Sequence, residues 1–138
     1  MGINVIWQDE NGVEKNRVND PQNRLSLLVL ATSLDEFICL RFLDPYGNTY
    51  FNQRQIPVLL FELKGVRSTI TDSQFQGYYS DQTRQAKKAG WQDAVIKQLE
   101  SRQGLSMAQP VRDHLDAVIE LVKRSLDEVH TYIRFEGD

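Results

Sequence analysis

The sequence predicts an α+β protein, with a largely antiparallel sheet and helices packed on one face of that sheet. Two observations support this class. The expected elements mix strand pairs with helices instead of alternating regularly, and no internal repeat or long linker divides the chain. With 138 residues, 41% of them hydrophobic and 25% charged, the chain is typical of a soluble globular protein. We therefore expect a single domain over residues 1–138.

The N-terminal segment predicts a β-hairpin. Apolar residues alternate with polar ones over 3–8, as in a strand with one buried face. An Asn-Gly pair beginning at Asn11 is a strong turn signal. A two-residue loop would place Asp9 opposite Glu14, and like charges across a strand pair are unfavourable. We therefore expect a longer loop before a second strand over 13–18.

A helix is predicted next, over residues 21–32. Asp20 is suited to cap it, and Pro21 is suited to its first position, where a missing N–H does no harm. The apolar run LSLLVLA would also suit a buried strand, and periodicity does not separate the two interpretations. The cap favours the helix.

The most distinctive stretch is 37–63. Its first part, 37–43, predicts a strand that ends at Asp-Pro, and a Tyr-Gly-Asn turn then leads to a short returning strand over 49–51. A helix follows with Asn52 as its cap and Pro57 in its first turn. Apolar residues on several faces of this helix, Phe61 among them, predict a deeply buried element.

The second half of the chain predicts helices and a final strand. Residues 68–90 are polar and are interpreted as an exposed loop or insertion, with helical character resuming near Ser80 and interrupted at Gly90. Apolar residues then recur at three- or four-residue steps from Pro110 to Val129, which predicts one long helix. Residues 132–135 are typical of a short closing strand.

Composition and charge argue against several functions. The net charge of −3 offers no basic field for nucleic acid. No window reaches the length of a membrane span, and the N-terminus lacks the pattern of a signal peptide, so we expect no membrane association. One cysteine, Cys39, cannot form an intramolecular disulfide. These features favour a cytoplasmic protein.

No constellation of residues indicates catalysis. On one helix, His114 and His130 would lie roughly 24 Å apart, too far to share a metal. His130 would then interact with the carbonyls at that helix's C-terminus. Cys39 has apolar neighbours, which favour a core thiol over a nucleophile. Phosphate-binding glycine motifs are absent from the sequence. We therefore predict no catalytic residue, no metal site and no cofactor.

Two groups of residues are candidates for binding a partner. The first is a polar turn made of Asp44, Tyr46, Asn48, Asn52 and Gln55. Local duties in turn formation and helix capping explain these residues structurally, and a contact surface is the functional alternative.

The second group is the aromatic cluster Phe75, Tyr78 and Tyr79. Exposed tyrosines are favoured at protein interfaces, whereas a loop folded onto its own aromatic residues would explain the cluster equally well.

The segment 40–52, LRFLDPYGNTYFN, with Gln55 after it and the ending HTYIRFEGD over 130–138, resembles a group of small uncharacterised bacterial proteins. Members of this group are similar to proteins encoded beside toxins. The resemblance implies an immunity or other interaction role. The chain departs from the pattern at Asn48, where Asp is the more familiar residue, so the resemblance does not imply a role that needs an acidic turn.

We therefore expect a small non-catalytic interaction protein, of the bacterial immunity type, that binds and inhibits a toxin domain. One alternative is a small enzyme or ligand-binding domain with a site near residues 44–55. Another is a homo-oligomeric structural subunit, such as a homodimer, that uses an exposed strand or helix face.

Overall fold

The computed structural model describes residues 2–138 and confirms the predicted α+β class. The strands are β1 (Ile3–Asp9), β2 (Glu14–Val18), β3 (Asn48–Phe51) and β4 (Thr131–Gly137). They form one antiparallel sheet with the order β2-β1-β4-β3. The helices are α1 (Arg24–Ala31), α2 (Ile56–Thr69), α3 (Asp72–Lys88), α4 (Asp93–Gln103) and α5 (Ala108–Ser125).

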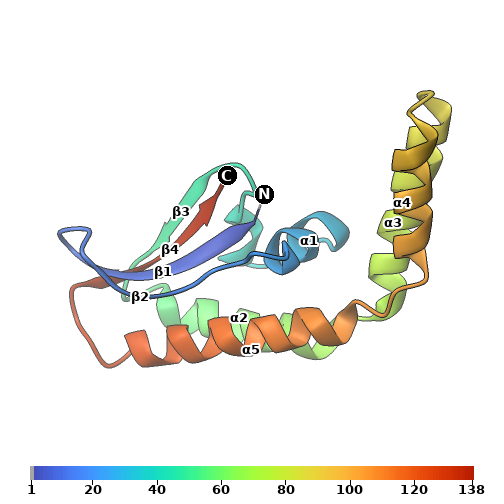
Figure 1. Cartoon of the computed structure of the whole chain (residues 1–138). Helices are drawn as coiled ribbons and strands as arrows, with labels where there is room; N and C mark the ends of the chain where they lie inside the picture. Colours follow the sequence, from blue (N-terminus) through green and yellow to red (C-terminus); the bar gives the residue numbers. More distant parts are fainter. Residues whose placement is uncertain (1) are drawn as a thin grey trace.

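The elements form a body and a projection (Figure 1). In the body, α2 and α5 run side by side along one face of the sheet, and α1 lies at the end of the sheet nearest the projection. The projection is a hairpin of α3 and α4 that points away from the direction of α5. No helix within residues 2–138 is both long enough and apolar enough to cross a membrane.

The N-terminal hairpin has the longer loop that the sequence predicts. Gln8, not Asp9, faces Glu14, because the register shifts after Trp7. The Asp9 carboxylate accepts the backbone N–H groups of two loop residues, one of which is Val13. This carboxylate therefore stabilises the loop without facing a like charge.

The helix predicted over 21–32 exists but begins at Arg24. Asp20 still serves its start, because its carboxylate accepts the backbone N–H groups of Arg24 and Leu25. The same carboxylate accepts the N–H of Ile3 in β1. One buried side chain thus joins the sheet to α1, and Asn23, with a φ of 58°, turns the chain into the helix.

The strand predicted over 37–43 is wrong. This stretch is irregular and contains only a short 3-10 turn, Leu40–Phe42. The Glu62 carboxylate of α2 accepts the backbone N–H groups of Ile38, Cys39 and Leu40. These N–H groups are therefore not available for hydrogen bonds to a neighbouring strand. The short strand after it, β3, is confirmed, but it pairs with β4.

The helix predicted after Asn52 is confirmed as α2, with Pro57 in its first turn. Asn52 accepts the N–H groups of residues 54 and 55 through its side chain, so it serves the turn that precedes α2. Residues on one face of α2 are buried, including Leu59 and Leu63. Phe61, however, is 79% exposed, so the buried surface is narrower than predicted.

The exposed loop or insertion predicted at the start of the stretch 68–90 is wrong, because α3 already begins at Asp72. The helical character predicted from about Ser80 and the interruption at Gly90 are confirmed. Thr71 and Gln74 make a capping box at its start. The buried side chains of α3 are Phe75, Tyr79, Thr83 and Ala86. These residues recur at three- or four-residue steps, and the polar residues between them conceal the narrow apolar stripe.

The long C-terminal helix is confirmed in type but ends earlier than predicted, at Ser125. Val129 lies beyond it and is 74% exposed. His130 has a φ of 60° and precedes β4 directly, so it does not lie at the helix's C-terminus. The closing strand is confirmed as β4, where Ile133 and Phe135 are buried.

Candidate functional site

The α3–α4 hairpin projects from the body of the fold (Figure 1). α3 contacts α1 and α4, whereas α4 packs on α3 (Figure 1). None of the residues of α4, all of them described, is buried. Gly90, with a φ of 73°, makes the turn between the two helices, and Trp91 next to it is 53% exposed. An aromatic side chain is therefore presented near the free end of the projection.

Polar contacts fix the base of the hairpin to the body. Asp72 at the start of α3 accepts the N–H of Ala108 at the start of α5, at 2.9 Å. Arg112 of α5 donates to the backbone oxygen of Ile70 at 2.6 Å, in the connection between α2 and α3. Within the hairpin, Gln103 donates to the hydroxyl of Thr83 at 2.7 Å, although the rest of α4 has few such contacts with α3. The hairpin thus has a defined orientation.

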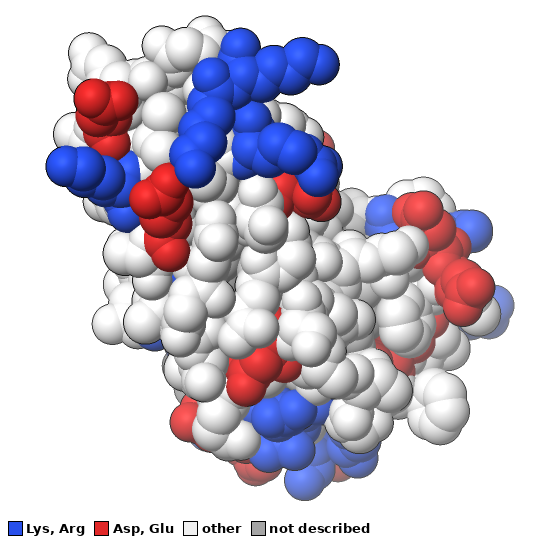
Figure 2. Space-filling view, turned by 90° about the vertical axis from the view of Figure 1, so that its right-hand side faces the viewer, with Lys and Arg blue, Asp and Glu red and all other residues white. Residues whose placement is uncertain are grey.

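The free end of the hairpin is basic, although the chain as a whole is acidic. Residues 84–97 contain four basic side chains, Arg84, Lys87, Lys88 and Lys97, and one acidic side chain, Asp93. Figure 2 shows Lys and Arg side chains at the top of the view, where Figure 1 places the end of the hairpin, with Asp and Glu side chains beside them. Arg84 pairs with Asp81 and Lys87 pairs with Glu100. Among the described residues, Lys88 and Lys97 have no ion pair.

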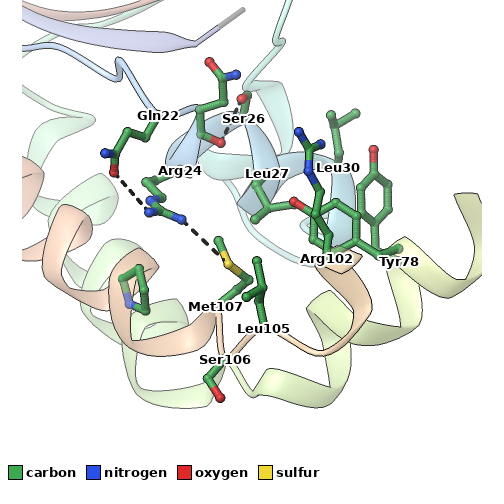
Figure 3. A pocket seen from close by; sticks show the side chains of 13 residues that line it. Gln22, Arg24, Ser26, Leu27, Leu30, Tyr78, Arg102, Leu105, Ser106 and Met107 are labelled. Carbon is green, nitrogen blue, oxygen red and sulfur yellow. Dashed lines mark hydrogen bonds between the residues drawn. The ribbon is translucent and has the colours of Figure 1, made fainter. Parts of the chain in front are cut away.

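A pocket lies between α1 and the base of the hairpin, with a volume of about 530 Å³ (Figure 3). Leu27 and Leu30 line it from α1, Tyr78 and Tyr79 from α3, Arg102 from α4, and Met107 from the connection to α5. Arg24, at the start of α1, completes one side. The pocket is therefore assembled from segments that are distant in the sequence.

Tyr78 and Tyr79 form an aromatic wall of this pocket, with ring centroids 5.4 Å apart in an edge-to-face arrangement. Burial raises the pKa of Tyr78 above its ordinary value, and interactions with Tyr79 and Tyr46 raise it further, whereas Arg102 opposes them. The Tyr78 hydroxyl is therefore neutral near pH 7. The Arg102 guanidinium lies 5.9 Å from the centroid of the Tyr79 ring, within range of a cation–π contact.

The polar turn predicted as a binding site is held together by local hydrogen bonds. Asp44 accepts the N–H of Tyr46 at 2.8 Å. Asn52 and Gln55 bond to each other twice, because the side chain of each accepts the backbone N–H of the other. Asn48 starts β3 and is exposed. Hydrogen bonds within the turns therefore account for Asp44, Asn52 and Gln55, whereas the predicted helix cap by Asn52 is wrong because α2 begins after Gln55 without a side-chain cap. Tyr46 is 67% exposed.

The aromatic cluster predicted on an exposed loop is largely part of the core. Phe75 is fully buried and Tyr79 is 9% exposed, so only Tyr78 is half-exposed. Tyr78 and Tyr79 line the pocket between α1 and the hairpin, whereas none of the five residues of the polar turn lines it.

The titratable residues considered for chemistry are dispersed. Within residues 2–138, no group of three His, Cys, Asp or Glu side chains is arranged to hold a metal ion. Cys39 is buried, and burial, followed by the nearby Glu62 charge, raises the pKa of its thiol. His114 lies 3.6 Å from Asp20 in the body, whereas His130 lies 3.7 Å from Glu10 at the surface.

The pocket contains residues that the sequence did not indicate. Arg24, Arg102 and Met107 belong to three elements and carry no local motif. Of the lining residues, only Tyr78 and Tyr79 are predicted from the sequence as binding residues, and the sequence places them on an exposed loop. Comparisons of the chain with protein-family models, curated proteins and solved structures find no match.

Proposed function

We propose that this protein is a non-catalytic interaction protein that binds a protein partner through the free end of the α3–α4 hairpin, residues 84–97. The exposed Trp91 beside unpaired lysines carries the proposal. Tryptophan is enriched among the residues that dominate binding energy at interfaces. A helix such as α4, which buries no residue in its own chain, has a face available for a partner.

The charge of this end favours a partner with an acidic surface. Residues 84–97 are basic, whereas the chain as a whole has 16 basic and 19 acidic residues. Complementary charge increases the rate of association and selects among partners. The resemblance of segments 40–52 and 130–138 to proteins encoded beside toxins supports a narrower form of the proposal. In that form the protein is a cytoplasmic immunity protein, and the partner is a toxin domain.

The direct test is binding of the full chain to the product of the adjacent toxin gene, measured by co-purification and calorimetry. We expect Trp91→Ala and the double variant K88E/K97E each to weaken binding by about tenfold or more. The matched controls are Phe61→Ala and Lys64→Glu, because both residues are exposed on α2, away from the hairpin. These controls should bind like the wild type.

Two results would separate the parts of the proposal. Binding of the toxin domain that is unaffected by the hairpin variants would contradict the hairpin as the contact surface. A lack of binding to adjacent toxin products from several genomes would contradict the immunity role. Concentration-dependent size in sedimentation, removed by Trp91→Ala, would instead identify a second copy of the chain as the occupant.

The alternative of a ligand site near residues 44–55 lacks a supporting observation. The pocket at the hairpin base is lined by neither Asp44 nor Asn52. A second hollow, about 440 Å³, lies beside the segments 29–35 and 40–43 and also excludes them. The interaction proposal is therefore the one that the geometry supports best.

A further inference from the structure

The pocket between α1 and the hairpin base has positive charge without a matching acid. Its lining includes Arg24 and Arg102 but no aspartate or glutamate. Arg24 donates to uncharged acceptors, the Sδ of Met107 at 3.7 Å and the Oε1 of Gln22 at 3.0 Å. Arg102 lies over the ring of Tyr79. In the described part of the chain neither guanidinium has an ion pair.

Apolar side chains line the pocket beside these two charges, together with the polar residues Gln22, Asn23, Ser26 and Ser106, and Arg102 is exposed to solvent. Figure 3 shows Arg24 and Arg102 on opposite sides of Leu27, which lies between them in the view. Leu30 and Leu105 also line the pocket and are 41% and 50% exposed. Water-exposed apolar surface next to unpaired guanidinium groups matches a ligand that is itself apolar at one end and anionic at the other.

We propose that this pocket binds a small organic carboxylate with an aromatic or aliphatic body. A guanidinium presents a planar pair of N–H donors that fits the two oxygens of a carboxylate. The volume of about 530 Å³ lies within the range of small-molecule sites and exceeds the size of a bicyclic acid.

A carboxylate suits the pocket better than a phosphate. Phosphate sites commonly use successive backbone N–H groups in glycine-rich loops, and glycine does not line this pocket. Moving a doubly charged phosphate from water to a position next to the leucines would also cost more desolvation free energy than moving a singly charged carboxylate. Tyr78 and Tyr79 supply an aromatic wall that suits the uncharged body of such a ligand.

The test uses 2-naphthoate as the probe and 2-naphthol as its neutral analogue, titrated into the full chain by calorimetry at pH 7. A hydrogen bond to a charged group contributes about 1.5–3 kcal/mol, which corresponds to about tenfold or more in the dissociation constant. We therefore expect naphthoate to bind about tenfold more tightly than naphthol. Equal affinity, or weaker binding of naphthoate, would overturn the proposal.

Arginine variants locate the binding within the molecule. We expect Arg24→Gln and Arg102→Gln each to weaken naphthoate binding by about tenfold and to leave naphthol binding unchanged. The control is Arg84→Gln, because Arg84 is exposed on the same hairpin and pairs with Asp81. Arg102 lies on a helix without buried residues, so its variant should retain the fold, which circular dichroism would verify.

Two outcomes of this series would contradict the assignment: naphthoate binding that survives Arg102→Gln, and an equal loss in Arg84→Gln. The test is independent of the protein partner. Trp91→Ala, which is expected to weaken the partner complex, should leave naphthoate binding unchanged because Trp91 does not line the pocket. Failure of one proposal therefore leaves the other intact.

Discussion

The body and the free end of the hairpin differ in how their helices are stabilised. In the body, α5 buries eight residues and contacts the sheet, α1 and α2. On the hairpin, α4 buries none and packs on α3. Because helices in proteins are stabilised mainly by packing of an apolar face, α4 depends on a small number of half-buried contacts.

This difference indicates where sequence changes are tolerated. A segment with few buried apolar contacts opens at a lower free energy than the core, and its exposed positions contribute little to global stability. The end of the hairpin can therefore present aromatic and basic side chains without cost to the body. The following predictions test the contrast, in decreasing order of expected effect.

The largest effect is expected from a core truncation. Leu115→Ala, at a fully buried position of α5, should lower the free energy of unfolding by about 3 kcal/mol through lost burial and cavity formation. The matched Leu99→Ala, at a half-buried position of α4, should cost about 1 kcal/mol. Urea unfolding followed by circular dichroism measures both. Equal losses would contradict the contrast between body and hairpin.

The second prediction concerns the Glu62 carboxylate, which holds residues 38–40 onto α2. Glu62→Gln keeps the shape but removes the charge and one acceptor oxygen, so we expect a loss of about 2 kcal/mol. Glu120→Gln on α5 is the control, because Glu120 is exposed and pairs only with Lys123. If the two variants were equally stable, Glu62 would not have the structural role inferred for it.

A third, smaller effect is expected at the turn of the hairpin. Gly90 has a φ of 73°, which alanine adopts poorly, whereas nothing within 4 Å would obstruct an added Cβ. Gly90→Ala should therefore destabilise by about 1 kcal/mol through the backbone alone. Gly104→Ala, at the end of α4 with a φ of −87°, should be close to neutral. Hydrogen exchange of the α4 amides would show the difference, and a costly Gly104→Ala would argue against this explanation.

The smallest effect is a pH dependence in the body. Burial lowers the pKa of His114, Arg24 lowers it further, and Asp20 opposes them. The unfolded chain therefore binds the proton more readily, so the stabilisation is complete above about pH 6.5 and decreases as the pH falls toward the folded pKa. His114→Gln should flatten this part of the stability curve.

The control for that measurement is His130→Asn, because His130 is exposed and asparagine tolerates its positive φ. Chemical unfolding at a series of pH values below 6.5 measures the slopes. A slope that persists in His114→Gln and disappears in His130→Asn would reverse the assignment.

Elements with a local signal were predictable from the sequence. Alternation identified β1 and β4, and the three- or four-residue recurrence of valine and leucine identified α5. The duty assigned to Asp44 in its turn also matches the observed hydrogen bond, whereas Asn52, predicted to cap α2, bonds within the turn before it. In each case the sequence pattern that identified the feature lies within a few residues along the chain, although β1 and β4 pair with each other over a long sequence distance.

Features that depend on distant contacts were not predictable. Residues 37–43 have the composition of a strand, but a carboxylate more than twenty positions later, Glu62, binds their backbone N–H groups. The buried face of α3 includes Phe75 and Tyr79 but few other apolar residues, so the sequence shows no clear helical periodicity in this polar stretch. The pocket joins Arg24 to Arg102 from separate helices, and no local pattern indicates such a meeting.

The position of β4 determines when the sheet can assemble during synthesis. β4 lies between β1 and β3, and Ile3 pairs with Gly137. The inner edge of β1 therefore has unpaired N–H and C=O groups until almost all of the described chain has left the ribosome. Contacts this distant in sequence form slowly, whereas the local contacts of the α3–α4 hairpin form quickly. The hairpin, the less stable region at equilibrium, is thus expected to be among the first to acquire structure.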